Sequence, residues 1–441
     1  MADVQYDIAV LGGGPAGYAA AIRASQLKAK VCLIEKGELG GTCLNRGCIP
    51  TKSMLASIEL YSKIKRADKF GINVSGLSID LKKVIERKDR IVSRLVKGVE
   101  HLIKQHKIDL IKGEGKLKGT GVIELRAQST ELRAQKIILA TGSEPMDIPG
   151  FEVDHKKIIN SNGILNLTEI PKTMEILGCG VIGLQFARIF SDMGTEVTIC
   201  EALPKVLPMI DEEVSNALID LIKKRKIQIN MNVKLSKPSG KDITFVAAGR
   251  KPNTEGLKEA GAEMVKDKFV KVNERMETNL SGVSAAGDIT GINMLAHVAY
   301  AQGKVAAEAA CGKTSKIDYS VVPMCIFTDP EVAAVGLTEA QAKEKGIEIK
   351  IGRFPFGALG KARTIGEEDG FVKIIADAKS NKVLGVHIIG PQATVLIAEA
   401  ALAIKLGAKV EDIANLIHAH PTLPEAVMEA AESIFGQAIH I

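Results

Sequence analysis

A glycine-rich motif occurs twice in this 441-residue chain, and the second copy begins at Gly178, 166 residues after Gly12. In the first copy an apolar run, residues 6–11, leads into the glycines, and a second apolar run, 31–34, ends at an acid. The residues that repeat at this spacing are Gly12, Gly14, Gly17 and Glu35, which correspond to Gly178, Gly180, Gly183 and Glu201. A strand, a glycine loop, a helix and a second strand closed by an acid form the fingerprint of a dinucleotide-binding βαβ unit. The sequence therefore predicts an α/β fold with two Rossmann-like dinucleotide-binding domains.

Each residue of this fingerprint has its own physical role. The first glycine allows a tight turn, the second lets a pyrophosphate approach the backbone, and the third lets the helix pack against the strand. The helix N-terminus stabilises the phosphate charge. Glu35 and Glu201 can accept hydrogen bonds from ribose hydroxyls, and a carboxylate at position 201 repels a 2′-phosphate. The second site is therefore expected to prefer NAD over NADP.

Three further apolar runs end in small or acidic residues. They are 137–142, which closes with Thr141 and Gly142; 245–250, which contains Gly249; and 283–288, which closes with Asp288. The Asp288 carboxylate suits a ribityl or ribose hydroxyl. Tight strand ends are common in proteins that bind no nucleotide, so these runs support nucleotide contacts only in combination with the glycine loops.

Two cysteines, Cys43 and Cys48, follow the first glycine loop closely. On a regular helix their Cα atoms would be roughly 8 Å apart, beyond the ~7 Å limit for a disulfide. A bridge therefore needs a distorted helical turn, which Gly47 makes easier. The alternative is two unrelated buried cysteines, although polar Asn45 and Arg46 between them disfavour it. A zinc site is less well supported, because no second Cys or His pair follows at ligand spacing.

The motif His420-Pro-Thr-Leu-Pro-Glu425 contains a candidate acid/base for such thiols. An isolated histidine is more often structural, and that reading suits His418. Glu425 has two compatible interpretations. It can orient His420, and with Thr422 it can form a capping box that opens a helix over residues 426–435.

Composition and charge limit the class of protein. The chain carries 58 Lys and Arg against 52 Asp and Glu, a net charge of +6, and no Trp. This small excess is spread along the chain, so nucleic acid is not an expected partner. No apolar run is long enough to suggest a transmembrane segment, so a membrane is not expected either. Seven cysteines, an odd number, do not make a secreted disulfide framework. A reducing, cytoplasmic location is expected, and an organelle form that has lost its targeting peptide stays open.

Taken together, these motifs resemble the FAD-dependent pyridine nucleotide disulfide oxidoreductases, and within them the dihydrolipoamide dehydrogenases. Besides the cysteine and histidine motifs, the matching segments are Met294-Leu-Ala-His297 and Phe327-Thr-Asp-Pro-Glu331. The resemblance implies FAD on the first unit, NAD on the second and a homodimer. It also implies roles for individual residues: Cys43 as the thiol that exchanges with substrate, Cys48 as the thiolate beside the flavin, Lys52 near the flavin, Asp288 and His297 at the cofactor, and His420 as a base supplied by the partner subunit.

The activity implied is oxidation of protein-bound dihydrolipoamide with NAD⁺. The implied partner is the lipoyl-bearing domain of a 2-oxoacid dehydrogenase or glycine cleavage complex. The chain departs from the family pattern at Gln185, where the family has Glu, and between Val233 and Ile243, where the family has an antiparallel meander. Two alternatives therefore stay open: another FAD disulfide reductase, similar to glutathione or mercuric reductase, or a flavin-binding complex subunit with impaired NAD turnover.

The predicted domain order follows from these motifs. Residues 1–145 form an FAD-binding domain and 146–268 an NAD-binding domain. A central segment, 269–316, returns to the FAD site, and an α+β interface domain for dimerisation spans 317–441. In the last of these, alternating residues predict strands at 371–376 and 382–389, and the apolar helix at 392–406 is expected to be buried.

Overall fold

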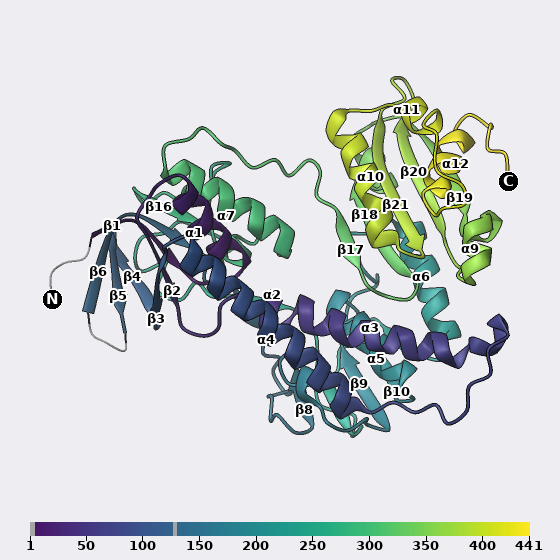
Figure 1. Ribbon diagram of the computed structural model, residues 1–441, viewed down its shortest axis with the longest axis horizontal. Helices are drawn as coiled ribbons and strands as arrows, with labels where there is room; N and C mark the ends of the chain where they lie inside the picture. The colour runs from purple at the N-terminus through teal and green to yellow at the C-terminus, as the bar shows by residue number, and fades with distance from the viewer. Residues whose placement is uncertain (1–4, 127–129) are drawn as a thin grey trace. The chain divides into compact units, whose positions relative to one another are not determined.

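The computed structural model describes residues 5–126 and 130–441, which form two compact units (Figure 1). The first unit comprises residues 1–148, 159–169 and 248–318, and the second comprises 149–158, 170–247 and 319–441. The chain therefore passes between the units several times. Each unit is described by itself below.

The first unit is built on a seven-stranded sheet. Its strand order is β3-β2-β1-β6-β5-β4, and β16 pairs with β6. The strands are β1 (Gln5–Leu11), β2 (Val31–Glu35), β3 (Asp109–Lys112), β4 (Gly115–Gly119), β5 (Val122–Leu125), β6 (Thr130–Leu139) and β16 (Val283–Ala285). Strands β3, β2, β1, β6 and β16 run parallel, whereas β4 and β5 form an antiparallel extension. This is the predicted Rossmann-like arrangement, with β1 at its centre.

Helices and short ribbons complete the first unit. Its helices are α1 (Pro15–Gln26), α2 (Gly41–Arg46), α3 (Cys48–Lys65), α4 (Leu81–Gln105) and α7 (Ala296–Ala310). Helix α1 packs on α7, and α3 packs on α4. The ribbons are β7 (Ser143–Pro145) with β13 (Arg250–Pro252), and β14 (Met264–Val265) with β15 (Phe269–Val270). The β7–β13 ribbon joins the two chain segments that carry the candidate cofactor residues 141–142 and 249.

The other nucleotide-binding sheet has the order β11-β10-β9-β12-β8; strands β9 to β12 belong to the second unit, and the boundary between the units falls within β8. These strands are β8 (Ile158–Asn160), β9 (Thr173–Leu177), β10 (Glu196–Glu201), β11 (Gln228–Met231) and β12 (Ile243–Val246), accompanied by α5 (Val181–Asp192) and α6 (Glu212–Lys224). Residues 232–242 connect β11 to β12 without a strand, where the family pattern has an antiparallel meander. The connection is anchored, since Ser239 N donates to the buried Glu175 carboxylate at 3.2 Å.

An antiparallel sheet of order β17-β18-β21-β20-β19 forms the rest of the second unit. It comprises β17 (Met324–Ile326), β18 (Glu331–Gly336), β19 (Ile349–Pro355), β20 (Phe371–Asp377) and β21 (Val383–Gly390), with helices α8 (Glu339–Glu344), α9 (Gly360–Ile365), α10 (Ala393–Leu406), α11 (Val410–Ala414) and α12 (Glu425–Ser433). The two predicted strands are confirmed as β20 and β21. Helix α10 lies along β18 and β21, and α12 lies along β19 and β20 (Figure 1).

The prediction that the helix at 392–406 is buried is only partly right. Its buried side packs on the sheet through Leu396, Ile397 and Ala400. On the other side Leu402 and Leu406 remain 60% and 75% exposed in the single chain. When a helix is apolar around much of its surface, its sequence does not show which face packs against the same subunit and which face stays exposed.

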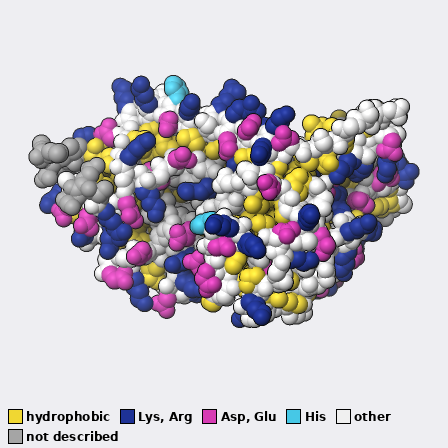
Figure 2. All heavy atoms as spheres, turned by 90° about the horizontal axis from the view of Figure 1, so that it is seen from below, with side chains coloured by type: hydrophobic (Ala, Val, Ile, Leu, Met, Phe, Trp, Pro, Cys, Tyr) yellow, Lys and Arg dark blue, Asp and Glu magenta, His cyan; other side chains and the backbone are white. Residues whose placement is uncertain are grey.

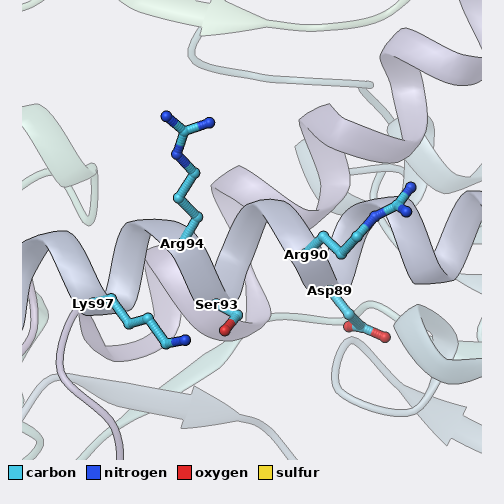
Figure 3. Close-up of a pocket in the computed structure, with 5 residues that line it drawn as sticks. All are labelled: Asp89, Arg90, Ser93, Arg94 and Lys97. Carbon is cyan, nitrogen blue, oxygen red and sulfur yellow. The ribbon is translucent and has the colours of Figure 1, made fainter.

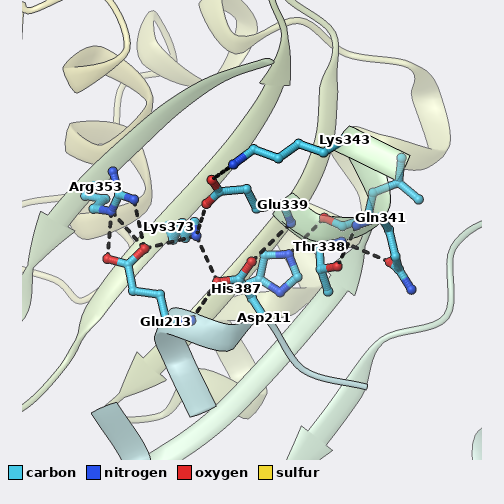
Figure 4. A network of polar contacts seen from close by, with 10 residues as sticks. Asp211, Glu213, Thr338, Glu339, Gln341, Lys343, Arg353, Lys373 and His387 are labelled. Atoms are coloured by element: carbon cyan, nitrogen blue, oxygen red, sulfur yellow. Dashed lines mark hydrogen bonds and ion pairs between the residues drawn. The ribbon is translucent and has the colours of Figure 1, made fainter. Parts of the chain in front are cut away.

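Helix α6 is anchored to the antiparallel sheet by a buried ionic network (Figure 4). Lys373 on β20 is 1% exposed, and its Nζ lies 2.8 Å from Asp211 Oδ1, 3.0 Å from Glu213 Oε2 and 2.9 Å from Glu339 Oε2. Arg353, beside Lys373 on β19, also pairs with Glu213 at 2.7 Å. Asp211 caps α6 by accepting from Glu213 N. The network therefore joins the nucleotide-binding sheet to the antiparallel sheet at the start of α6.

Candidate active site

The first glycine loop has the geometry of a pyrophosphate site. Gly12 has φ +105°, and a Cβ there would lie 2.3 Å from Ala140 O. A Cβ on Gly17 would lie 1.7 Å from Gly12 O, so both positions require glycine. At Gly14, in contrast, the nearest atom to a Cβ would be Gly41 Cα at 3.8 Å. Gly14 therefore leaves open space at the start of α1, where a phosphate is stabilised by backbone N–H groups.

The second loop repeats this geometry. Gly178 has φ +104°, and a Cβ on Gly183 would lie 2.1 Å from Gly178 O. A Cβ on Gly180 would meet nothing within 4 Å. In both loops, therefore, the first and third glycines leave no room for a side chain, whereas the second glycine borders free space. Each loop fits a dinucleotide.

The two acids that close the second strands are held in matching ways. Glu35 accepts from Gly13 N at 2.6 Å and from Gly37 N at 2.7 Å. Glu201 accepts from Cys179 N at 2.7 Å and from Leu203 N at 2.8 Å. These bonds fix each carboxylate beside its glycine loop, where it can also accept from a ribose hydroxyl.

The other predicted cofactor residues lie in the first unit. Thr141 and Gly142 follow β6, and Asp288 follows the neighbouring β16, so they meet at the carboxyl edge of the sheet, where nucleotides bind in such folds. Gly249, with φ +118°, precedes β13, and its amide partner is Met146, whose N–H donates to Gly249 O at 3.1 Å. His297 lies in the first turn of α7.

Two residues at this edge were not predicted, Ser143 and Arg250. Ser143 Oγ donates to Asp288 Oδ2 at 2.5 Å, and Arg250 Nε donates to Ser143 Oγ at 2.7 Å. Arg250 Nη2 also donates to Thr42 Oγ1 at 3.4 Å, next to the first cysteine. The only feature of the sequence that could have identified them is their position, because Ser143 directly follows Gly142 and Arg250 directly follows Gly249. The chain of contacts links the Asp288 carboxylate to the helix that carries Cys43.

The cysteine pair lies where α2 ends and α3 begins. Gly47 separates the helices with φ −144° and ψ −109°, which supplies the predicted distortion between Cys43 and Cys48. Both cysteines are free, and the Cys43 thiol donates a hydrogen bond to the Cys48 sulfur. This bond and the positive charge of Lys52 lower the pKa of Cys48 to about 6, while the same bond and burial raise the pKa of Cys43. Cys48 is therefore the more acidic of the two thiols.

The histidine motif lies in the second unit. His420 Nδ1 is 2.8 Å from Glu425 Oε1, and Glu425 Oε2 accepts from Thr422 N at 2.7 Å. Burial alone would raise the pKa of Glu425, but the bonds from Thr422 N and His420 hold it below its usual value. A carboxylate on Nδ1 leaves Nε2 as the nitrogen that can accept a proton. The imidazole is 77% exposed. His418, in contrast, bonds to Glu399 and Leu416 O, as expected of a structural residue.

The predicted capping box is wrong. Helix α12 starts at Glu425, with Pro424 as its N-cap, and the Thr422 hydroxyl donates to Ala419 O at 2.6 Å instead of capping a helix amide. Only the half in which the Glu425 carboxylate accepts from Thr422 N is formed. Glu425 therefore contacts the His420 imidazole from the first position of helix α12.

Among the described residues, no helix is long and apolar enough to cross a membrane, and no group of three His, Cys, Asp or Glu side chains is arranged to hold a metal ion. A surface pocket of about 450 Å³ lies on α4 and is lined by Asp89, Arg90, Ser93, Arg94 and Lys97 (Figure 3). It contains no residue of the glycine loops or the thiol pair. On the face drawn in Figure 2, acidic and basic side chains are interspersed.

Comparison with protein families gives two matches. The profile of the pyridine nucleotide-disulphide oxidoreductases matches residues 6–303. The profile of the dimerisation domain of the same enzymes matches residues 322–431.

Individual relatives agree with these profiles. Dihydrolipoyl dehydrogenase of Bacillus subtilis is 41% identical over 470 positions, covering 99% of both chains, and the mitochondrial dihydrolipoyl dehydrogenase of Pisum sativum is 41% identical over 463 positions, covering 99% of this chain and 92% of the relative. The solved structure of LpdA from Mycobacterium tuberculosis superposes with a TM-score of 0.90 at 26% identity, covering 98% of this chain and 99% of that one. Because 470 aligned positions exceed 441 residues by 29, at least that many positions of the Bacillus alignment have no residue here.

Proposed function

Because the chain belongs to the pyridine nucleotide-disulphide oxidoreductase family, we propose that it is a dihydrolipoyl dehydrogenase, which oxidises protein-bound dihydrolipoamide to lipoamide with NAD⁺. The observation that carries this proposal is the Cys43–Cys48 pair, with one thiol and one low-pKa thiolate, in the same unit as an open dinucleotide loop. Enzymes of this family use FAD and NAD, and relatives named dihydrolipoyl dehydrogenase match the chain over nearly its whole length. The glutathione- and mercuric-reductase alternatives are not favoured by these relatives.

Thiol chemistry defines the first half of the reaction. In the oxidised protein Cys43 and Cys48 share a disulfide. One substrate thiolate attacks Cys43 Sγ, the Cys43–Cys48 bond breaks, and Cys48 leaves as a thiolate. The second substrate sulfur then attacks the first, closing the lipoamide ring and releasing the electron pair to Cys43. Two electrons and two protons leave the substrate in this sequence.

The protein's own residues prepare and stabilise these steps. His420 accepts a proton from the substrate dithiol at Nε2, and Glu425 holds its ring and stabilises the imidazolium. Lys52 stabilises Cys48 as the leaving thiolate, and the Cys43 thiol adds to this stabilisation once the lipoamide ring has closed. When bound, FAD would supply the two-electron transfer between the Cys43–Cys48 dithiol and NAD⁺.

The cofactor assignments follow the two loops. FAD is assigned to Gly12, Gly14, Gly17 and Glu35, with Lys52, Thr141, Gly142, Asp288 and His297; NAD is assigned to Gly178, Gly180, Gly183, Glu201 and Gly249. The functional domains proposed are 1–145 for FAD, 146–268 for NAD, 269–316 as the central segment and 317–441 as the interface. Glu201 supports NAD over NADP because its carboxylate, held in place by backbone N–H groups, would repel a 2′-phosphate.

The protein is a homodimer, as the match to the dimerisation domain indicates. The exposed apolar residues Leu402, Leu406 and Ile417 support this state, because a second copy would remove them from water. In the dimer His420 is proposed to serve the thiols of the partner subunit. The proposed partner is a lipoyl-bearing domain of a 2-oxoacid dehydrogenase or glycine cleavage complex. A reducing compartment such as the cytoplasm suits seven cysteines that are all free.

The test is steady-state NADH production from dihydrolipoamide and NAD⁺ by the FAD-loaded protein. We expect turnover that disappears in Cys43→Ser, with little activity on glutathione disulfide and NADPH. A protein that reduces glutathione disulfide faster than it oxidises dihydrolipoamide would contradict the proposal. Flavin binding without either activity would instead identify a complex subunit that does not turn over NAD.

A further inference from the structure

A second acid on α12 is buried and depends on one short segment for its hydrogen bonds. Glu429 is 1% exposed. Its Oε1 is 2.5 Å from His440 Nδ1, and its Oε2 accepts from Ile439 N at 3.0 Å and His440 N at 3.4 Å. Within the described residues, every hydrogen bond recorded for this carboxylate comes from residues 439 and 440. A buried carboxylate needs such partners, since an unpaired one is strongly destabilising.

The segment that supplies these partners runs back along the helix. Helix α12 ends at Ser433, Gly436 turns with φ +67°, and Gln437 N donates to Glu432 O at 3.1 Å. His440 then meets Glu429, one turn from Glu425, so the segment 436–441 points toward the N-terminus of α12. This end of the helix is where Glu425 holds His420.

Three carboxylates of α12, those of Glu425, Glu429 and Glu432, interact electrostatically with the His440 imidazole, and Glu429 also contacts it directly. Glu425 and Glu429 are four residues apart on the helix, a spacing at which like charges repel. The His440 imidazolium offsets this repulsion, and its bond to Glu429 raises the pKa of His440.

We propose that His440 is a positioning residue for the dithiol reaction: by holding Glu429 it fastens segment 436–441 along α12 and fixes the helix end that presents Glu425 and His420. The inference rests on the proposed function, in which His420 is the base. The folded pKa of His440 is raised, so its stabilising contribution is fully present below the ordinary histidine pKa and is lost as the pH rises through the folded value. His440 is therefore expected to matter most at acidic to neutral pH.

The experiment uses three test variants: His440→Ala, Glu429→Gln and the double variant that combines them. The control is Ile439→Ala, which keeps both the imidazole and the backbone N–H groups that Glu429 uses. Dihydrolipoamide oxidation and NADH oxidation by an artificial acceptor are measured from pH 5.5 to 9. We expect His440→Ala to lower kcat for the dithiol reaction by roughly 3- to 10-fold, less than the ~10²-fold loss expected for a general base. We also expect the acidic limb of the pH profile to move to higher pH. The double variant should be no worse than the worse single variant, because both remove one interaction. His440→Arg should recover part of the activity.

Hydrogen exchange of residues 420–433 provides a second readout that needs no activity. His440→Ala should accelerate exchange at the start of α12, whereas Ile439→Ala should leave it unchanged. If His440→Ala matches Ile439→Ala in pH profile and exchange, the positioning role is wrong. If the native protein oxidises no dihydrolipoamide at any pH, the proposed function fails, and faster exchange in His440→Ala would still establish the fastening of α12.

Discussion

The Cys43 thiol donates a hydrogen bond to the Cys48 sulfur, and this contact separates the acidities of two chemically identical groups. It assigns the thiolate to Cys48 and leaves Cys43 as the protonated member of the reduced pair. The residue roles implied by the family resemblance agree with this asymmetry.

The first prediction concerns the acidity of Cys48. Cys43→Ala removes the donor and should raise the pKa of Cys48 above its present value of about 6, whereas Cys43→Ser keeps a donor and should raise it less. The pH dependence of alkylation by iodoacetamide in the reduced protein measures this value. With FAD bound, Cys43→Ser should show a long-wavelength charge-transfer band without reductant. A band in Cys48→Ser but not in Cys43→Ser would reverse the two roles.

The second prediction concerns His420. His420→Ala should reduce dihydrolipoamide turnover by ~10²-fold or more, the usual scale for a general base. NADH oxidation by artificial acceptors should fall much less, because it bypasses the dithiol. Equal losses in both assays would make His420 structural. Mixing Cys43→Ser subunits with His420→Ala subunits should restore some activity if the base acts across the dimer.

The third prediction separates folding from cofactor binding at the first glycine loop. Gly17→Ala places a Cβ 1.7 Å from Gly12 O, so it should destabilise the fold itself. Gly14→Ala meets no protein atom closer than 3.8 Å and should fold normally, but its methyl group occupies the space proposed for the pyrophosphate. Thermal unfolding of the apoprotein and the FAD content per chain measure the two effects. A Gly14→Ala protein that holds FAD normally would refute this placement.

The fourth prediction compares Lys373 and Lys343, which both pair with Glu339. Only Lys373 also pairs with the buried Asp211. Lys373→Met leaves Asp211 buried without its cation and should cost about 3–5 kcal/mol of unfolding free energy. Lys343 is 66% exposed and lies 2.8 Å from Glu339, so Lys343→Met should cost under about 1 kcal/mol. Urea unfolding measures both, and similar losses would show that burial does not set the strength of this network.

The same network predicts acid sensitivity. Hydrogen bonds from Lys343 and Lys373 lower the pKa of Glu339 to about 2. Its contribution to stability is therefore present above the ordinary glutamate value and should be lost as the pH falls through about 2. A Glu339→Gln protein should lose less stability than the native protein over this range. Identical pH dependence in the two proteins would contradict the assignment.

The fifth prediction concerns nucleotide choice. Glu201→Ser removes the carboxylate that repels a 2′-phosphate, so the ratio of NADP⁺ to NAD⁺ turnover should rise. Glu35→Ser, the equivalent change in the other loop, serves as a control and should affect FAD content instead. An unchanged NADP⁺ to NAD⁺ ratio would show that another residue sets the preference.

Local patterns made much of the site predictable. Gly12 and Gly17 can be recognised from sequence because the clash of a Cβ with a nearby backbone oxygen is a property of the loop itself. Glu35 and Glu201 were predictable for the same reason, since each bonds to backbone amides of its own loop. The repeat at 166 residues then identified both loops together.

Non-local contacts were not predictable in this way. Asp288, Ser143 and Arg250 meet because β6, β16 and the β7–β13 ribbon end at one edge, which no single sequence window shows. The capping box failed because α12 begins at Glu425, so this residue occupies the first and not the third position of the helix. The partner of Glu429 also lies outside the helix, in residues 439 and 440.

The anchoring of α6 limits how this protein can be dissected. Besides the Lys373 network at its start, Arg225 at its end pairs with Asp329, which follows β17. A recombinant fragment covering only residues 319–441 would keep Lys373 and Glu339 but lose Asp211 and Glu213, so Lys373 would lack two of its three counter-charges. Such a fragment is expected to express as an aggregating or poorly folded product. The segment 322–431 that the dimerisation-domain profile matches is therefore not expected to fold unaided.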